Sequence, residues 1–346
     1  MEKLSLGVAY HGSRFYSAVE ADMKDIIKHN FNTVIHMFSH NDWVRSSEVM
    51  KDIFACTTGL GLDLWVDNWG LGGSPGDPSH FLSYHPEAHQ YFSDGEMIPN
   101  AVCMNNPAYR AWTKEWIDKV YEIGGRKIFW DEPHLKSTEE KFACGCPTCK
   151  KIFKEKYGYE MPIIPNQDCF EFQSWTIVDY FKDVTAYSNS KGMINSVCVM
   201  LGKGIGINLD NIEELKSIET MDNIGTDPYW ISKKLATGGA EVYKFVYPAA
   251  KKCVDVASSV GKGHNVWIQS YRTPVGHEED IVYAAEAAYD AGARNIFFWG
   301  FRGCEGNNYR SKVPEFTWRA AGDAAERILN KERDRVIAAA RKELGL

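Results

Sequence analysis

The chain lacks the features that mark several classes of protein. Within its 346 residues, no apolar run approaches the ~20 residues that a membrane-spanning helix needs. No charged segment followed by an apolar one opens the chain, so we expect no secretory signal peptide. The net charge of −7 argues against nucleic acid or an anionic membrane surface as the main partner.

The sequence also lacks a disulfide framework. Its nine cysteines are an odd number, and four of them have spacing typical of a metal site. This usage fits a reducing compartment, and we expect a cytoplasmic protein. The aromatic share of 13% is high, which provides either faces on which sugars stack or simply an aromatic-rich core. The sequence leaves a homo-oligomer open.

Apolar strand-like segments alternate with helical segments along the whole chain. The strand-like segments are Leu4–Tyr10, Thr33–Phe38, Leu62–Asp67, Lys127–Asp131, Ile194–Met200, Ile224–Asp227, Val266–Tyr271 and Asn295–Gly300. Repeated strand-then-helix order predicts a parallel sheet, and eight repeats predict an α/β protein with a single (β/α)8 TIM barrel over residues 1–346. A doubly wound sheet is the alternative, but the turn at residues 10–14 lacks a phosphate-binding loop.

Two of the predicted connections are long. Residues 68–106 follow the third strand and residues 132–169 follow the fourth, whereas such connections usually have ~2–6 residues. Loops of this length are generally lids or binding loops. The glycines at 202–206 also follow a strand, but isolated glycine patterns are weak evidence for a phosphate site, and we interpret them as a flexible loop.

The cysteines give the most specific motif. Cys103, Cys144, Cys146 and Cys149 supply four thiolates, enough for a closed tetrahedral zinc site. Four thiolates leave no open position on the metal, so we expect a structural zinc ion that ties the two long loops together. The alternative is that Cys103 is unrelated and that the CxCxxC triplet is a redox or surface feature.

Two carboxylates stand where the fourth predicted strand ends, at Asp131 and Glu132. Active sites of TIM barrels are built at this end of the strands. Glycosidic bond cleavage needs a carboxylic acid that protonates the leaving oxygen, and an apolar or anionic setting favours that acid by raising its pKa. Glu132 is our candidate for the acid. The alternatives are an ion-pair partner, a metal ligand or a structural carboxylate.

Further candidate site residues follow other predicted strands. They are Asp67 and Trp69 after the third strand, Asp227 and Tyr229 after the sixth, Gln269 on the seventh, and Trp299, Arg302 and Glu305 at or after the eighth. His36, His40 and His11 could bind sugar hydroxyl groups, although a lone histidine is more often structural. Asp227 could instead cap a helix or hydrogen-bond at the barrel rim.

These residues resemble a known family. Asp131-Glu132-Pro133-His134 resembles the Asn-Glu-Pro signature that closes the fourth strand of clan A glycoside hydrolases, in which the Glu is the acid/base. Cys103 with the CxCxxC at 144–149 is similar to the cysteine pattern of family 42, the zinc-containing β-galactosidases. Segments 107–110, 224–229 and 292–299 add weaker similarities. The resemblance implies a TIM-barrel glycosidase with a zinc ion and a carbohydrate substrate.

The sequence also departs from that family. Asp131 replaces the signature Asn, and Gln269 falls at or near the position of the nucleophilic Glu. An amide cannot attack the anomeric carbon as a carboxylate does, so the retaining chemistry does not transfer. An inverting hydrolase needs a separate base ~6.5–9.5 Å from Glu132, for which Asp227, Glu305 and Asp67 are candidates in that order. Alternatively, Gln269 marks a lost activity or an inactivating substitution.

We therefore expect a glycoside hydrolase that acts on a small glycoside or oligosaccharide, with Glu132 as its general acid. Two other classes remain open because a fold does not determine a function. One is a catalytically silent carbohydrate-binding barrel, which Gln269 favours. The other is a barrel hydrolase or lyase whose substrate is not a sugar.

Overall fold

The computed structural model describes residues 3–69, 71, 80–138, 141–202, 205–231 and 238–344. Eight parallel strands form a closed barrel in the order β1-β10-β9-β8-β7-β6-β3-β2. Their bounds are β1 Ser5–Tyr10, β2 Thr33–Met37, β3 Asp63–Asp67, β6 Lys127–Trp130, β7 Ile194–Val199, β8 Asn223–Thr226, β9 Gly263–Gln269 and β10 Asn295–Trp299. The predicted TIM-barrel fold is confirmed.

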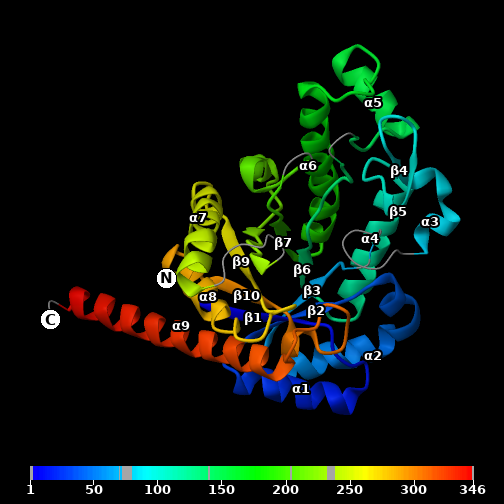
Figure 1. The fold of residues 1–346 in the computed structure, drawn as a ribbon. Coiled ribbons are helices and arrows are strands. Elements are labelled where there is room, and N and C mark those ends of the chain that lie inside the picture. The colour runs from blue at the N-terminus through cyan, green and yellow to red at the C-terminus, as the bar shows by residue number, and fades with distance from the viewer. Residues whose placement is uncertain are drawn as a thin grey trace.

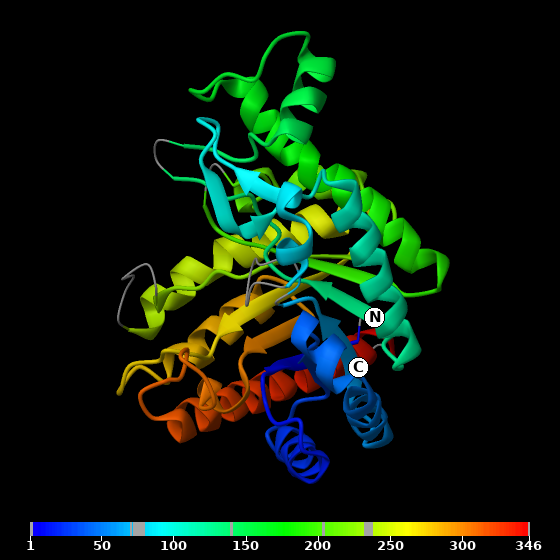
Figure 2. The same cartoon turned by 90° about the vertical axis from the view of Figure 1, so that its right-hand side faces the viewer.

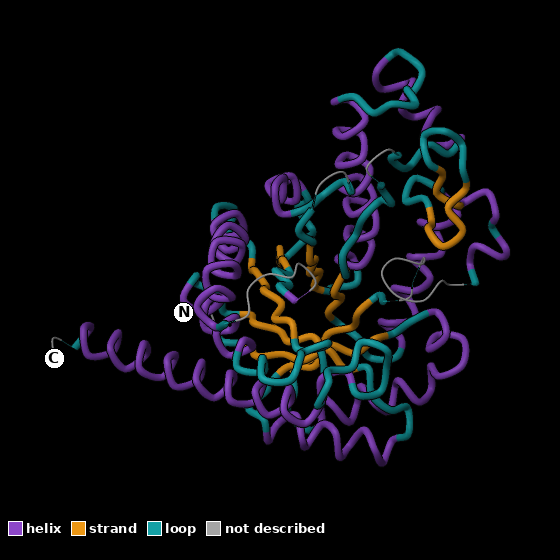
Figure 3. The backbone as a smooth tube through the Cα atoms, in the orientation of Figure 1, coloured by secondary structure: helices purple, strands orange, loops and turns teal. Residues whose placement is uncertain are grey.

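Helices surround this barrel (Figures 1 and 3). They are α1 Tyr16–Lys28, α2 His40–Gly59, α4 Pro107–Glu122, α6 Gln167–Ser190, η2 Leu209–Ser217, α7 Gly239–Ser258, α8 Asp280–Asp290, η4 Phe301–Cys304 and α9 Pro314–Glu343. Each long helix buries one face; α1, for example, buries Val19, Met23 and Ile26, which lie one turn apart. The second half of α9 extends past the barrel in Figure 1. Among the described residues, no helix is both long and apolar enough to cross a membrane.

The strands alternate between two environments. Side chains of Ile35, Trp65, Phe129, Trp267 and Phe297 belong to the cluster inside the barrel. The residues between them pack against the helices instead, in a larger cluster. The inside of the barrel is therefore a packed core, and only the side chains at its ends can meet a ligand.

The sequence predicts a helix over Ser46–Cys56, but helix α2 begins earlier, at His40. The Ser39 hydroxyl accepts a hydrogen bond from the Asp42 amide at 3.2 Å, and the Asp42 carboxylate accepts one from the Ser39 amide at 3.0 Å. This reciprocal capping box satisfies amides that the first turn leaves unpaired. The helix therefore starts at His40.

Both long connections contain secondary structure. The first holds α3 Phe81–Tyr84, η1 Pro86–Ala88 and an antiparallel hairpin of β4 His89–Tyr91 and β5 Met97–Val102; residues 70 and 72–79 of it lie outside the described residues. The second holds α5 Pro147–Tyr157. Figure 2 shows the hairpin beside α5 and α6, above the barrel. These elements bury a second apolar core around the four cysteines. Of the predicted glycine loop at 202–206, residues 203–204 also lie outside the described residues.

Candidate active site and metal centre

Carboxyl groups gather at the carboxyl ends of three strands. Asp67 is the last residue of β3, Asp131 follows β6, and Asp227 follows β8. In β6, Phe129 faces the inside of the barrel, and alternation directs Asp131, two residues later, to the same side. Hydrogen bonds from the Asn68 amide to the Phe129 carbonyl (3.3 Å) and from the Asp131 amide to Asn68 Oδ1 (3.0 Å) hold the ends of β3 and β6 together.

Glu132 departs from this alternation. Strand geometry would direct it to the helix side, opposite to Asp131. Its φ is +36°, in the left-handed region that non-glycine residues rarely adopt. The turn that results brings two consecutive carboxyl groups, Asp131 and Glu132, to the same pocket. Unusual backbone conformations of this kind cost about 1–3 kcal/mol and cluster at functional sites.

The pocket at this end of the barrel has a volume of about 90 Å³. The described residues that line it are Trp69, Asp131, Glu132, Tyr229, Tyr271, Trp299 and Tyr309. Five of these seven carry aromatic rings, and the other two carry carboxyl groups. Such a lining offers apolar faces for a sugar ring and acidic groups for its oxygens.

Glu132 and Asp227 form a pair of carboxyl groups. They lie close enough for one, when protonated, to hydrogen-bond to the other. Burial, followed by the negative charge of Glu132 and this hydrogen bond, raises the pKa of Asp227 well above its ordinary value. Asp227 therefore retains its proton to higher pH than an isolated carboxyl would. Only Glu132 of the two lines the pocket, so Asp227 lies behind it.

Asp67 and Asp131 extend the acidic cluster. Burial raises the pKa of both carboxyls well above the ordinary value, and the charges of neighbouring carboxyl groups raise it further. Asp67 Oδ1 accepts a hydrogen bond from the Trp69 amide at 2.8 Å. Its Oδ2 is buried and has no hydrogen-bond partner among the described residues. The four carboxyl groups therefore share one poorly solvated space.

Aromatic rings bound that space on two sides. Trp69 and Trp299 both contact the His11 ring, with centroids 5.2 Å and 4.9 Å away. Tyr271 contacts the rings of Tyr229 and Tyr309 at 5.4 Å and 5.9 Å. Burial and the Arg14 cation lower the pKa of His11 to about 4, so His11 is neutral at pH 7. Burial and the nearby carboxyls raise the pKa of Tyr271, so its hydroxyl remains a hydrogen-bond donor.

Asp227 lies closer to Glu132 than the base of an inverting glycosidase lies to its acid. An inverting base must leave room for a water molecule, with ~6.5–9.5 Å between the carboxyl groups. Asp227 instead lies close enough to Glu132 for a hydrogen bond when one of the two is protonated. Asp227 as the base of an inverting reaction therefore stays a prediction, and its closeness to Glu132 favours a role beside the acid instead.

Gln269 is buried at the end of β9, and its side chain holds a loop. Its Oε1 accepts a hydrogen bond from the Ile231 amide at 3.0 Å. Ile231 belongs to the segment that follows β8 and carries Tyr229. Gln269 therefore supports a wall of the pocket from behind and is not among the described residues that line it.

His36 lies away from the pocket. It is fully buried on the helix side of β2, where its Nε2 hydrogen-bonds with Thr57 Oγ1 of α2 at 2.9 Å. Its neighbours Ile35 and Met37 face the inside of the barrel. The same alternation therefore directs His36 outward, and we leave it out of the candidate site.

Arg302 and Glu305 also face elsewhere. Arg302 forms ion pairs with Asp22 (3.7 Å) and Asp25 (3.2 Å) of α1 and with Glu305 (3.5 Å). These contacts tie η4 to the helix layer. Neither residue is among the described residues that line the pocket, so both are left out of the candidate site.

Tyr271 and Tyr309 line the pocket, and the sequence did not single them out. Tyr271 was accessible to prediction, because it stands two residues after Gln269 on the inward-facing side of the same strand segment. Tyr309 lies in the irregular segment between η4 and α9. No periodicity indicates where such a residue points.

The four predicted cysteines come together in the second apolar core. Their sulfur atoms all lie within 4.8 Å of one another, and all four residues are buried. Cys103 Sγ lies 3.4 Å from Cys149 Sγ and 3.6 Å from Cys146 Sγ. This buried cluster could hold a metal ion.

Local structure fixes the cysteine-bearing loops. Cys146 caps α5, and its sulfur accepts a hydrogen bond from the Cys149 amide at 3.4 Å. The Gly145 amide donates to the Tyr91 carbonyl at 2.7 Å, and a Cβ at Gly145 would lie only 2.8 Å from the Phe92 carbonyl oxygen. Asn105 Nδ2 donates to Cys149 Sγ at 3.3 Å. The hairpin after β3 and the loop after β6 therefore meet at the cysteines.

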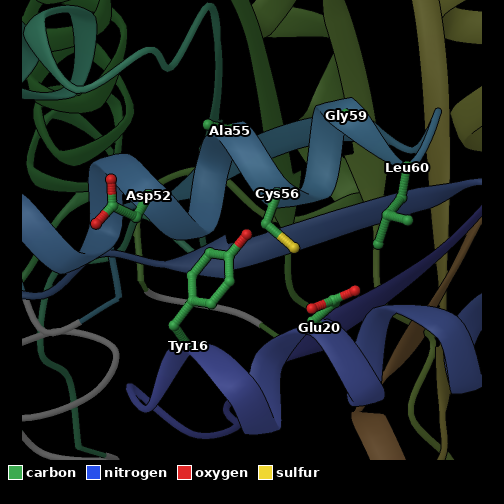
Figure 4. A pocket seen from close by; sticks show the side chains of 7 residues that line it. All are labelled: Tyr16, Glu20, Asp52, Ala55, Cys56, Gly59 and Leu60. Atoms are coloured by element: carbon green, nitrogen blue, oxygen red, sulfur yellow. The ribbon is translucent and has the colours of Figure 1, made fainter.

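A larger hollow lies on the outside of the barrel. Tyr16 and Glu20 of α1 and Asp52, Cys56 and Leu60 in and after α2 line a groove of about 570 Å³ (Figure 4). It lies in the helix layer, whereas the carboxyl cluster lies at the strand ends. Asp52 in this groove is exposed, and it lies outside the carboxyl cluster.

Comparison with known proteins establishes the fold. No protein-family model matches the chain, and no curated protein does. Among solved structures, the chain is similar to the catalytic domain of β-amylase from Paenibacillus polymyxa, with a TM-score of 0.63, 9% identity, and coverage of 91% of this chain and 96% of that chain. It is also similar to an endo-1,4-β-mannanase from Rhizomucor miehei (TM-score 0.61, 11% identity, 94% and 95% coverage). A third is a D-psicose 3-epimerase from Clostridium cellulolyticum H10 (0.52, 12%, 94% and 99%). At these identities, the likeness is one of fold.

Proposed function

We propose that this protein is a glycoside hydrolase in which Glu132, paired with Asp227, protonates the glycosidic oxygen. The observation that carries the proposal is the carboxyl pair at an aromatic-lined pocket on the catalytic face of a TIM barrel. The fold it shares with a β-amylase and a mannanase supports a carbohydrate substrate. The resemblance of residues 131–134 to the clan A signature supports Glu132 as the acid.

The pair explains how a proton is available near neutral pH. An ordinary carboxyl has a pKa of about 4 and is almost fully ionised at pH 7. Burial and the charge of Glu132 raise the pKa of Asp227, so a proton stays on Asp227, within reach of Glu132, to higher pH. Glu132, which reaches the pocket, delivers that proton to the leaving oxygen. Asp227 acts as a positioning residue that holds the proton against Glu132.

We also propose that the cysteine cluster binds a structural zinc ion, as the resemblance to family 42 implies. Zinc–sulfur bonds of about 2.3 Å in a tetrahedron separate the sulfurs by about 3.8 Å. Two of the sulfur separations, 3.4 Å and 3.6 Å, fit that spacing with small adjustments. The ion would supply no chemistry to the pocket, because four thiolates leave it no open position. Leu135, three residues after Glu132, packs in the cysteine core, so the ion stabilises the segment that carries the acid.

A substrate screen tests the proposed activity. Wild-type protein and Glu132→Gln are assayed on aryl glycosides and oligosaccharides, with Glu305→Gln as the matched control because Glu305 pairs with Arg302 instead of lining the pocket. We expect wild type and Glu305→Gln to turn over at least one glycoside and Glu132→Gln to lose on the order of 10²–10⁴ in rate. A glycoside that binds but that none of the three proteins turns over would contradict the proposal and favour a carbohydrate-binding barrel.

A further inference from the structure

The turn at Glu132 goes against the local preference of the chain. Its φ of +36° lies in the left-handed region, and Pro133 follows it directly. The residue before a proline favours an extended conformation. Contacts from outside the local sequence must therefore hold Glu132 in the conformation that turns its side chain to the pocket.

One such contact comes from Asn68, the residue after β3. Strands β3 and β6 pair in register as far as Asp67 and Phe129, and the Asn68 amide continues the ladder by donating to the Phe129 carbonyl at 3.3 Å. The next bond of a parallel ladder would run from the Asp131 amide to the main-chain carbonyl of Asn68. That carbonyl instead accepts a hydrogen bond from the Leu71 amide at 2.8 Å.

The side chain of Asn68 takes the place of this carbonyl. Asn68 Oδ1 accepts the hydrogen bond from the Asp131 amide at 3.0 Å. The main chain after β3 can therefore turn toward Leu71 while the end of β6 stays anchored at the residue before Glu132. Asn68 is partly buried and is not among the described residues that line the pocket, so it would act on a substrate only through the residues that it holds.

We propose that Asn68 is a positioning residue for the acid: its side-chain oxygen holds the Asp131 amide, and this bond keeps the Glu132 carboxyl turned into the pocket beside Asp227. Without the acceptor, the amide of the buried Asp131 loses its partner, and residues 131–132 can return to an extended conformation. Strand alternation would then direct Glu132 to the helix side. The role in catalysis rests on the proposed function, whereas the placement of the Glu132 side chain does not.

Three substitutions at Asn68 separate the acceptor oxygen from the rest of the side chain. Asn68→Ala removes the oxygen, and Asn68→Ser keeps a polar group that is too short to reach the same point. Asn68→Asp keeps an acceptor oxygen at the same distance from the main chain. Asn32→Ala is the matched control, because Asn32 Oδ1 accepts a hydrogen bond from the Leu6 amide at 2.9 Å at the opposite end of the barrel.

Crystal structures of these four variants report the position of Glu132 without any assay. In Asn68→Ala and Asn68→Ser, we expect Glu132 to leave the left-handed region and its carboxyl to leave the pocket. In Asn68→Asp and Asn32→Ala, the turn should stay as in wild type. A Glu132 that keeps its φ and its place in Asn68→Ala, or in Asn68→Ser if Asn68→Ala does not fold, would overturn the inference.

Rates on aryl glycosides test the role in catalysis. Asn68→Ala should lose about 10²-fold on weakly acidic phenols, because a small displacement of a catalytic group can cost that much. It should lose much less on strongly acidic phenols, which need little protonation. Loss of folded protein alone would lower both rates equally, as we expect of Asn32→Ala if that variant is less stable. Asn68→Asp should keep the leaving-group dependence of wild type.

A double variant shows whether Asn68 acts through Glu132. In the Glu132→Gln background, Asn68→Ala should change the rate by about twofold or less, because both substitutions remove the same function. Additive losses would mean that Asn68 acts through another residue, which contradicts the inference.

The outcomes separate this inference from the proposed function. Turnover that depends on Glu132, in a protein whose turn survives Asn68→Ala, overturns the inference and leaves the hydrolase proposal standing. A turn that depends on Asn68, without turnover of any glycoside, supports the placement of Glu132 by Asn68 and overturns the hydrolase proposal.

Discussion

The first prediction at the scale of single residues concerns the pH dependence of stability at Asp227. Its pKa is raised above the value of about 3.9 that it has in the unfolded chain. Between that value and the folded pKa, the folded state holds a proton that the unfolded state has lost. The contribution of Asp227 to stability is therefore fully present below about pH 4 and is lost as pH rises through the folded pKa. A tenfold change in an acid dissociation constant between the two states corresponds to about 1.4 kcal/mol of stability.

We therefore expect Asp227→Asn to be more stable than wild type near neutral pH, with a difference that grows as pH rises. The amide does not titrate, and its N–H can still donate to Glu132. Thermal unfolding at pH 5, 6, 7 and 8 measures the difference, with the exposed Asp52→Asn as the control. A constant difference at all four values would contradict the buried pair.

A substitution at Arg302 distinguishes a structural role of this residue from a role in binding substrate. Its side chain is 38% exposed and pairs with carboxylates of α1, so solvent weakens each ion pair. We expect Arg302→Gln to lower the free energy of unfolding by about 1 kcal/mol or less. KM and kcat should stay within about twofold of wild type. A large rise in KM without loss of stability would return Arg302 to the substrate site.

Individual residues differ in how far the sequence predicts them. Asp67, Asp131 and Asp227 follow from strand-end position and alternation alone. The positive φ of Glu132 does not follow from any propensity, because the surrounding chain imposes it. His36 also lies near the end of a predicted strand, but the period of two places it outside the barrel, so a strict count along β2 would have excluded it.

At the scale of elements, the cysteine cluster makes the firmest prediction. Purified protein should contain about one zinc ion per chain by elemental analysis. Cys146→Ser should lower the metal content and the unfolding temperature. Cys56→Ser, in α2 and outside the cluster, should leave the metal content unchanged. A strong chelator should act by unfolding the protein and not by competing with substrate.

Protein that contains no metal and keeps full stability would contradict this assignment. So would Cys146→Ser protein with a full complement of zinc, because the remaining three thiolates would then suffice.

The order of elements was predictable, whereas several of their bounds were not. Alternating apolar segments indicate the eight strands because each strand is buried and flanked by turn residues. The early start of α2 depends on side-chain capping at Ser39, which a periodic pattern does not detect. The β4–β5 hairpin and α5 were missed because their stability comes from the core around the cysteines, which no local pattern reveals.

At the scale of the whole molecule, barrel closure creates the site. Glu132 and Asp227 follow β6 and β8, with β7 between them. The closed sheet brings these strand ends to one space, and the turn at Glu132 directs its side chain into it. The eightfold repeat predicts this fold. It does not predict which strand-end carboxyls touch, because that depends on local turns such as the one at Glu132.

The absence of a carboxylate at Gln269 leads to a stereochemical prediction. No covalent glycosyl-enzyme can form on an amide that is buried and bonded to Ile231. We therefore expect water to attack directly and to invert the anomeric carbon, with Asp131, the other carboxyl that lines the pocket, as its base. Proton NMR of the first-formed product measures the anomer. Net retention would show that another carboxyl acts as a nucleophile.

The most direct test of the central claim is the dependence of the Glu132→Gln defect on the leaving group. Initial rates of wild type and Glu132→Gln are compared on aryl glycosides whose phenols range from strongly to weakly acidic. A proton donor matters most when the leaving group is poor. The account predicts a loss on the order of 10²–10⁴ for weakly acidic phenols and a much smaller loss for strongly acidic ones. Equal losses across the series would contradict it, because Glu132 would then bind substrate or support the fold instead of donating the proton.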